Sequence, residues 1–372
     1  MDATGYPKLD AGKCVRRIRR YRQGDLHAFE RFWNAQAGEA FAAERARAFQ
    51  RLLSGNPFSS TRDDYVVLEL DGRVAAYEGL MPFRFSISGR DVDGFIYHDT
   101  MVAPEMRGKG VGRAFVQAIL RDRPEFSIAV WMNAPNSHVF EKCGWLPVDG
   151  LPTYVRGYSL QNMVKTRYRL VNAAVEHTAR KVFALLYRLE KKVFDFSGRG
   201  YHIERVDYFD DRVDTLFQSL KHEFAFIAHR SGSILNWKFA DSPVSRFVRL
   251  ICLKGDRLQG YLVFKPGLEQ DGRKIATIFD FLCSPRDPGL FRALMRRAVL
   301  EIEKTGPDTV EVLCTDRRFA RVLKTMGFVR ARENPGALKY IHADAAGRPA
   351  GIGMGENWFY TFGDGDKVFW AW

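Results

Sequence analysis

The chain has 372 residues and a formal net charge of +13, with 46% hydrophobic and 27% charged residues. Its length suits two domains of about 150–200 residues each, and its composition is that of an ordinary globular protein. No apolar run approaches the ~18 residues that a transmembrane helix needs, and the excess positive charge would attract nucleic acid, anionic lipid, a phosphate-rich cofactor or an acidic substrate.

The N-terminal residues MDATGYPKLDAGK lack the apolar region of a secretory signal. The five cysteines are scattered and show no CxxC spacing, which favours reduced thiols over disulfides or a zinc site. Both features predict a cytoplasmic protein without a metal.

In the first half, residues 15–23 are predicted to form a short strand, and Asp25 is placed to cap a helical stretch that continues to about Leu53. A hairpin of strands at 66–70 and 74–88 follows, because the Asp71-Gly72 pair supplies the positive φ angles of a tight turn. The next predicted elements are a strand at 95–102, a helix from Gly112 that ends before Pro124, a strand at 127–132 and a short helix at 137–144.

A basic amphipathic segment separates the two halves. Apolar residues recur at helical spacing over residues 160–193, without glycine or proline, and Lys and Arg outnumber acidic residues there. We expect residues 158–200 to be a helical linker between domains 1–157 and 201–372. Peripheral contact of residues 160–193 with an anionic membrane is the alternative role.

The order of predicted elements repeats after the linker, which suggests a duplication. The predicted elements of the second half are a helical stretch at 214–225, strands at 247–253, 258–264, 275–282 and 309–314, and helices at 289–304 and 317–325. The endings FEKCGW at 140–145 and LKTMGF at 323–328 support this interpretation. Trp237 and Trp358 are expected to pack between the domains, with a substrate cleft as the second interpretation.

The stretch VAPEMRGKGVGRAF, residues 102–115, joins an expected strand to an expected helix. Its glycines allow backbone amides to approach an anion, and the N-terminus of the helix adds partial positive charge. Arg107 and Lys109 add cationic donors. A Walker loop is excluded because the GxxxxGKS/T pattern is absent, and the glycine spacing is wrong for a dinucleotide fingerprint. The stretch therefore predicts a site for the phosphates of another ligand.

Two motifs in the first half resemble the GCN5-related N-acetyltransferase (GNAT) superfamily. The pattern V-x-P-x-x-R-G-x-G-x-G, from Val102 to Gly112, is similar to its acyl-CoA-binding motif. The run from Asn133 through Phe140-E-K-C-G-W resembles its N-x6-Y-E-K-x-G-F element. The second half has SPRDPGLFRALM at 284–295 in place of the glycine loop, which predicts a degenerate copy that does not bind CoA.

The resemblance implies an α+β fold with a mixed, mostly antiparallel central sheet flanked by helices, in two tandem domains. It also implies that two neighbouring strands diverge after the fourth strand, and that the pantetheine arm of acetyl-CoA, the expected co-substrate, lies in the gap. The implied binding residues are Met101 and Val102 for the pantetheine, the amides of Arg107, Gly108, Lys109, Gly110, Val111 and Gly112 for the pyrophosphate, and Asn133 in the second motif.

Acyl transfer to an amine also needs a proton for the departing thiolate. Many relatives use a tyrosine at the position of Phe140, which cannot donate a proton. Tyr154, Tyr97 or water would have to take its place.

The incoming nucleophile needs a base, and the candidates are Glu78 on the third strand and Asp99 or His98 on the fourth. Strict alternation along a strand would put Tyr97, Asp99 and Met101 on one face and His98 on the other, so that only one of His98 and Asp99 faces a given cleft. Asp99 is preferred because a carboxylate in the middle of a strand is costly to bury and therefore tends to be kept for a reason.

These observations predict an acyltransferase that transfers an acetyl group from acetyl-CoA to an amine or hydroxyl of a small-molecule or saccharide acceptor. Segments beginning at Arg230 and at Asn357 resemble two-domain GNAT-like proteins, some of them linked to cell-envelope polysaccharide assembly. Two alternatives stay open: an aminoacyl transferase of the FemABX type that uses tRNA, which the intact acyl-CoA loop argues against, and a non-catalytic CoA-binding sensor or scaffold. No nucleic-acid partner is expected under the leading interpretation.

Overall fold

The computed structural model describes residues 17–53, 55–59, 65–121, 125–132, 134–148, 151–158, 201–241, 246–270, 273–331, 338–343 and 358–369. Residues 17–158 are referred to below as the first half and residues 201–369 as the second half. Residues 159–200 of the expected linker lie outside the described residues, so its helix and its role at a membrane stay predictions.

The strands are distributed over both halves. Those of the first half are β1 Ile18–Arg20, β2 Tyr65–Leu70, β3 Arg73–Ile87, β4 Arg90–Val102, β5 Phe126–Met132, β6 Leu146–Pro147 and β7 Thr153–Gly157. Those of the second half are β8 His202–Val206, β9 Phe226–Ala228, β10 Val248–Lys254, β11 Arg257–Gln270, β12 Arg273–Cys283, β13 Thr309–Leu313, β14 Val329–Arg330, β15 Leu338–Ala343 and β16 Trp358–Phe359.

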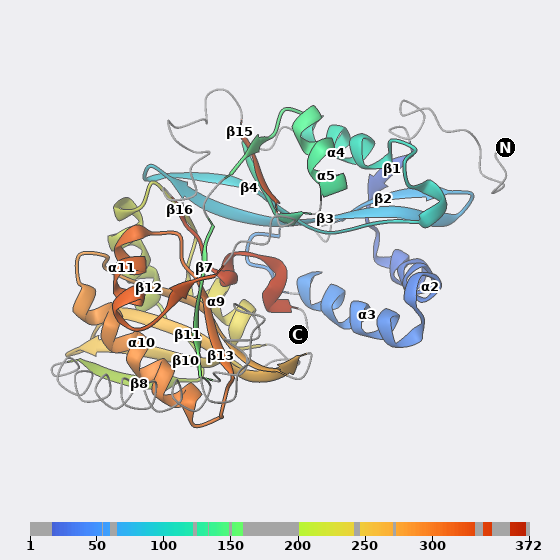
Figure 1. The fold of residues 1–372 in the computed structure, drawn as a ribbon. Coiled ribbons are helices and arrows are strands. Elements are labelled where there is room, and N and C mark those ends of the chain that lie inside the picture. Colours follow the sequence, from blue (N-terminus) through green and yellow to red (C-terminus); the bar gives the residue numbers. More distant parts are fainter. Residues whose placement is uncertain are drawn as a thin grey trace, which may run out of the picture.

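These strands form two sheets with helices on their faces (Figure 1). The first sheet has the order β1-β2-β3-β4-β5-β15-β6, and the second has the order β14-β7-β13-β12-β11-β10-β8. Neighbouring strands are mostly antiparallel, whereas β4–β5 and β12–β13 are parallel pairs. The predicted α+β class, with mixed and mostly antiparallel sheets, is confirmed.

Helices cover both faces of the first sheet (Figure 1). They are α2 Leu26–Ala37 and α3 Glu39–Leu53 on one face, and α4 Val111–Arg121 and α5 Ala134–Lys142 on the other. The second half contains α8 Arg212–Leu220, α9 Gly232–Phe239, α10 Pro288–Glu303 and α11 Arg317–Thr325. Of the helices in the described ranges, none is long and apolar enough to cross a membrane.

The prediction of one helical stretch after Asp25 is wrong in two respects. Gly38 has a φ of 87° and separates α2 from α3. The Asp25 carboxylate does not cap α2, because it accepts hydrogen bonds from the backbone amide of Arg22 at 2.7 Å and from the guanidinium of Arg19 at 2.6 Å. The predicted hairpin is confirmed, with φ angles of 51° at Asp71 and 72° at Gly72.

The two halves exchange strands. β15 of the second half lies between β5 and β6 in the first sheet, and β7 of the first half lies between β13 and β14 in the second sheet. Each exchanged strand follows a helix, a glycine turn and a two-residue strand, so the exchange is reciprocal. A division of the chain by residue number alone does not describe this arrangement, and the domain boundaries stay a prediction.

The C-terminal tail also connects the halves. β16 pairs with β9, and β9 pairs with β3 of the first sheet. The ring of Trp358 packs at a tilt on Phe226 with centroids 4.3 Å apart, and Trp237 packs in the same way on Phe369 at 4.8 Å. Both tryptophans are 2% exposed, and the carbonyl of Trp237 accepts a hydrogen bond from Arg51 of α3. The expected packing between the halves is therefore confirmed for Trp237, whereas Phe226, the ring partner of Trp358, belongs to the second half.

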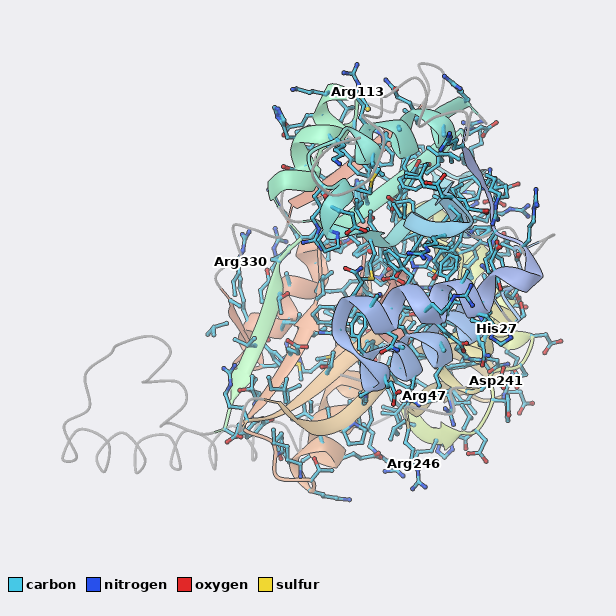
Figure 2. The ribbon with its side chains drawn as sticks, turned by 90° about the vertical axis from the view of Figure 1, so that its right-hand side faces the viewer. His27, Arg47, Arg113, Asp241, Arg246 and Arg330 are labelled. Carbon is cyan, nitrogen blue, oxygen red and sulfur yellow. The ribbon has the colours of Figure 1, made fainter. Side chains whose placement is uncertain are left out.

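Positive charge is spread over the surface. Arg47, Arg113, Arg246 and Arg330 are exposed; Arg113 lies at the top of the view and Arg330 at the left, whereas Arg47 and Arg246 lie near the lower end (Figure 2). These four side chains therefore do not form one basic patch.

β4 and β5 approach each other closely at Gly94. A Cβ atom added there would lie 2.0 Å from the carbonyl oxygen of Phe126. We expect Gly94→Ala to push the two strands apart and to lower the free energy of unfolding by about 1–3 kcal/mol, as overpacking does. Urea denaturation measures this, with Gly24→Ala as the control because a Cβ there meets nothing within 4 Å. Equal stability of both variants would contradict the close approach.

Candidate active site

The glycine loop lies between β4 and α4, where the sequence predicts a phosphate site. A short 3-10 helix, η2 Pro104–Met106, precedes it, and the amides of Arg107 and Lys109 bond back to Pro104 and Met106 at 3.2 and 3.4 Å. Gly108 and Gly110 have φ angles of 74° and 81°, which residues with a side chain rarely adopt. The turn leads directly into the first residues of α4, whose amides have no partner within the helix.

The side chain of Arg107 connects this loop to β4 by a hydrogen bond. Its Nε donates a hydrogen bond to the carbonyl oxygen of Val102 at 3.2 Å. Arg107 is exposed apart from this hydrogen bond, and Gly108 and Gly110 of the loop are exposed as well. The loop therefore presents a cation and the amides of Gly108 and Gly110 at the end of β4. The amides of Arg107 and Lys109, which were also predicted to bind the pyrophosphate, are instead bonded within the loop.

β4 and β5 form the fork that the resemblance implies. They pair in parallel from Gly94 and Phe126 to Tyr97 and Ala129, and then they separate. Beyond that point β4 continues to Val102 along β3, while β5 pairs with β15. Met101 and Val102, the predicted pantetheine-binding residues, thus lie on the part of β4 that borders the gap.

A bulge interrupts β4 just beyond the fork. The register with β3 shifts between Tyr77 and Gly79, so that Asp99 and Thr100 together oppose Glu78. Asp99 has a φ of 52°, in the left-handed region. An extra residue of this kind bends a strand and turns its side chains to new directions.

The predicted alternation of side chains on β4 is wrong because of this bulge. Tyr97 packs against Phe140 of α5, with ring centroids 5.7 Å apart. His98 instead lies against Tyr65, at 5.3 Å, on the face covered by α2 and α3. Asp99 turns to that same face, where it meets α3. His98 and Asp99 therefore share a face, and Tyr97 is on the other.

Asp99 is buried in a polar cluster. It forms an ion pair with Arg45 of α3, and the hydroxyl of Tyr77 donates to its Oδ2 at 3.2 Å. The same hydroxyl accepts a hydrogen bond from Nε1 of Trp33 at 2.9 Å. The Asp99 side chain is 3% exposed, and burial raises the pKa of Tyr77. No sequence pattern pointed to Arg45 or Tyr77 as partners of Asp99, because neither lies near Asp99 in the chain.

Glu78 lies in a different environment from Asp99. It is 2% exposed, and its Oε1 accepts a hydrogen bond from the hydroxyl of Thr100 at 2.7 Å. Burial raises its pKa to about 8, and the bond from Thr100 opposes that shift. Glu78 can therefore gain or lose a proton close to neutral pH, which suits an acid–base group.

The remaining predicted residues fall outside this arrangement. Phe140 is buried against Trp145, with ring centroids 4.7 Å apart. Tyr154 is on β7 in the second sheet, opposite Val312, and burial raises its pKa. Tyr154 therefore belongs to a different sheet from Glu78 on β3 and Asp99 on β4. Asn133 lies outside the described residues.

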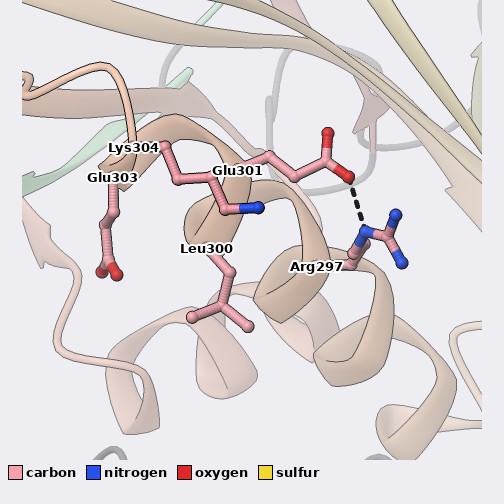
Figure 3. Close-up of a pocket in the computed structure, with 5 residues that line it drawn as sticks. All are labelled: Arg297, Leu300, Glu301, Glu303 and Lys304. Carbon is pink, nitrogen blue, oxygen red and sulfur yellow. Dashed lines mark hydrogen bonds and ion pairs between the residues drawn. The ribbon is translucent and has the colours of Figure 1, made fainter.

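Metal-ligating groups and pockets also bear on the site. Among the residues in the described ranges, no group of three His, Cys, Asp or Glu side chains could hold a metal ion. A pocket on α10 is lined by Arg297, Leu300, Glu301, Glu303 and Lys304, with an ion pair between Arg297 and Glu301 at 2.5 Å (Figure 3). It belongs to the second half and not to the fork between β4 and β5 (Figure 1).

Comparison with solved structures shows the same fold in known N-acyltransferases. A GCN5-related N-acetyltransferase from Anabaena variabilis has a TM-score of 0.59 and 12% identity, over 87% of this chain and 71% of that one. The corresponding enzyme from Kribbella flavida has a TM-score of 0.54 and 13% identity, over 89% and 71%. N-myristoyltransferase from Saccharomyces cerevisiae with bound myristoyl-CoA has a TM-score of 0.56 and 13% identity, over 92% and 81%.

Comparison by sequence is narrower. No curated protein matches the chain. Residues 17–148, which contain the fork and the glycine loop, match the family model described as acetyltransferase (GNAT) domain, and the chain as a whole shares the fold of the N-acyltransferases above.

Proposed function

We propose that the protein is an acyl-CoA-dependent acyltransferase that transfers an acetyl group from acetyl-CoA to the amine of a small-molecule or saccharide acceptor. The observation that carries this proposal is the fork between β4 and β5 with the glycine loop at its open end. The match of residues 17–148 to the GNAT domain and the bound myristoyl-CoA of the yeast structure support it.

The acyl donor lies along the fork in this proposal. The amides of Gly108, Gly110 and the first turn of α4 hold the pyrophosphate, since a helix N-terminus favours anions. Main-chain groups of Met101 and Val102 hold the pantetheine and direct the thioester into the gap. An amide aimed at the developing oxyanion contributes on the order of 3 kcal/mol to lowering the barrier.

Proton transfer completes the reaction. The Glu78 carboxylate takes a proton from the acceptor amine as the new C–N bond forms at the thioester carbon. The C–S bond then breaks, and the proton held by Glu78 passes through water to the CoA thiolate, because Phe140 has none to give. Phosphate-bearing donors also fit the excess positive charge of the chain.

The second half is the degenerate partner in this proposal, and it shapes the acceptor site. Residues 284–287 alone connect β12 to α10, where residues 103–110 connect β4 to α4. Asp287 accepts the amide of Leu290 at 2.9 Å and caps α10, and Pro288 removes one amide of the first turn. A carboxylate therefore already occupies the end of the helix where a phosphate would have to bind.

Charge reversal at Arg107 tests the donor site. We expect Arg107→Glu to weaken acetyl-CoA binding at least 100-fold, because a carboxylate would face the phosphates. Thermal shift measures this, since a ligand at a hundredfold excess over its Kd adds about 2.7 kcal/mol of stability. Arg121→Glu, an exposed position at the other end of α4, is the control and should bind normally. Equal affinity in both variants would contradict the placement of the phosphates.

Release of free thiol from acetyl-CoA in the presence of candidate amines separates an enzyme from a sensor. Binding without thiol release would favour the CoA-binding sensor. Absence of binding by any CoA species would contradict both.

A further inference from the structure

The two halves open their sheets at equivalent positions. β12 and β13 pair in parallel up to Ile278 and Val312 and then separate, as β4 and β5 do after Tyr97 and Ala129. β12 also has one extra residue relative to β11 just beyond this point, where the register shifts between Val263 and Phe264. β4 and β12 therefore both bulge at the mouth of a fork.

The same three side chains occur at both bulges. Asp280 is two positions beyond the last paired residue Ile278, as Asp99 is beyond Tyr97. The hydroxyl of Tyr261 donates to Asp280 at 2.9 Å. Tyr261 pairs with Leu282, two residues after Asp280, just as Tyr77 pairs with Met101.

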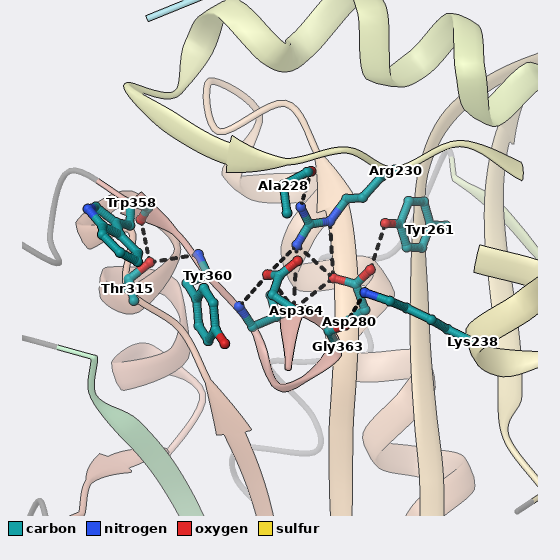
Figure 4. Close-up of polar contacts among 11 residues, drawn as sticks. Ala228, Arg230, Lys238, Tyr261, Asp280, Thr315, Trp358, Tyr360, Gly363 and Asp364 are labelled. Carbon is teal, nitrogen blue, oxygen red and sulfur yellow. Dashed lines mark hydrogen bonds and ion pairs between the residues drawn. The ribbon is translucent and has the colours of Figure 1, made fainter. Parts of the chain in front are cut away.

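An arginine completes each cluster. Arg230, which precedes α9, bonds to Asp280 at 3.2 Å (Figure 4). Arg45 does so for Asp99 from α3. Each arginine lies in the segment that connects the two strands at one edge of its sheet. These strands are β1 and β2 for Arg45, and β8 and β10 for Arg230.

The cluster of the second half is sealed by the C-terminal tail. The hydroxyl of Thr361 donates to Asp280 at 2.9 Å, and Asp364 accepts from Arg230 at 2.7 Å. Lys238 of α9 donates to the carbonyl of Gly363 at 2.7 Å (Figure 4). Arg230 is 1% exposed and Asp280 is 3% exposed. A Tyr–Asp–Arg cluster thus exists at a fork that is covered by the protein's own chain.

The pair formed by Glu78 and Thr100 is not repeated. Leu262 takes the position of Glu78, next to Tyr261, and Phe281 takes the position of Thr100, next to Asp280. The feature that the halves share is the Tyr–Asp–Arg cluster. The feature confined to the half with the glycine loop is the carboxyl and hydroxyl pair.

We propose that Arg45, Tyr77 and Asp99 are positioning residues that fix the bulged backbone of β4 at the acyl-donor site, and that Asp99 is not the base of the reaction. This inference rests on the proposed function and assigns the proton transfer to Glu78. The ion pair with Arg45 and the bond from Tyr77 hold Asp99 in its left-handed conformation, which a non-glycine residue keeps only when its surroundings fix it. The bulge in turn directs the backbone of residues 100–102 along the gap.

Asp99→Asn and Glu78→Gln, studied side by side, test this assignment. Asp99→Asn should raise the Kd and KM for acetyl-CoA about tenfold or more and keep the ascending limb of the pH–kcat profile, in which the rate rises as Glu78 loses its proton near pH 8. Glu78→Gln should lower kcat at least 100-fold, remove that limb and leave the Kd unchanged. The groups that face Glu78 are the hydroxyl of Thr100 from β4 and the neighbouring phenol of Tyr77, and its partner on β2 is Val66. Loss of the limb in Asp99→Asn, with the limb kept in Glu78→Gln, would overturn the assignment.

Amide hydrogen exchange tests the positioning role without any ligand. Exchange at residues 98–102 should be at least tenfold faster in Asp99→Asn and in Arg45→Met, unchanged in Glu78→Gln, and largely restored in Arg45→Lys. Equal protection in Asp99→Asn and in the unaltered protein would overturn the proposal. If the unaltered protein binds no acyl-CoA, the proposed function fails, and the exchange result still decides whether the cluster holds the bulge.

Discussion

Replacement of Glu78 by glutamine is expected to reduce the rate of acyl transfer at saturating acetyl-CoA by at least about 100-fold, the contribution of a positioned base. Glutamine keeps the size of the side chain and can still accept the hydrogen bond from Thr100, but it cannot take a proton. Release of CoA thiol measures the rate. A variant that retains a third or more of the activity would contradict the role of Glu78.

The same variant should be more stable than the unaltered protein in alkaline solution. Burial raises the pKa of Glu78 to about 8 from its ordinary value of 4.5, so the folded state holds a proton that the unfolded state releases. Between these two pKa values the unfolded state binds fewer protons, and the stability of the unaltered protein therefore falls as the pH rises. Above pH 8 the difference is constant, on the order of 3 kcal/mol or more.

Urea denaturation at pH 4 and pH 8 checks this. Glu78→Gln should match the unaltered protein at pH 4 and exceed it at pH 8. The exposed Glu44→Gln on α3 is the control and should change stability at neither pH. A lower stability of Glu78→Gln at pH 8 would show that the carboxylate is well solvated in the fold.

The second large effect is expected at the buried charges that hold the C-terminal tail. Arg230→Met leaves Asp280 and Asp364 buried without their guanidinium partner, and both lie 3% exposed or less. Removing one partner of a buried ion pair costs about 3–5 kcal/mol, because an uncompensated charge is left behind. We expect this loss in the free energy of unfolding, together with faster proteolysis of residues 358–369.

An exposed ion pair supplies the matched control. Arg286 is 78% exposed and bonds to Glu223 at 2.9 Å, so Arg286→Met should change stability by less than about 1 kcal/mol. If Arg230→Met were as stable as Arg286→Met, the network in Figure 4 would make no net contribution to folding.

The sequence predicted most elements and the glycine loop, because their signals are local. The turn at Asp71-Gly72, the helix after Gly110 and the strand 126–132 follow from turn chemistry and apolar periodicity over a few residues. The exchange of β7 and β15 has no such signal, since a short strand shows the same pattern in either sheet. Its partner is decided by pairing across more than a hundred residues of chain.

The environment of the carboxylates was less accessible from sequence. The bulge at Asp99 is visible only in the register with β3. It puts Asp99 on the same face of β4 as His98, whereas strict alternation puts it on the face of Tyr97. Arg45 and Tyr77 reach Asp99 from other elements, so a single stretch of sequence cannot reveal them. Tyr154 was proposed as a substitute for the tyrosine that Phe140 replaces, and strand exchange carries it into the other sheet.

The most direct test of the account is calorimetric titration of the full chain with acetyl-CoA. The account predicts one binding site per chain, formed by the loop and fork of the first half, and loss of that site in Arg107→Glu. Absence of binding would contradict the acyl-donor site itself, and two sites per chain would contradict the closure of the second fork by the tail.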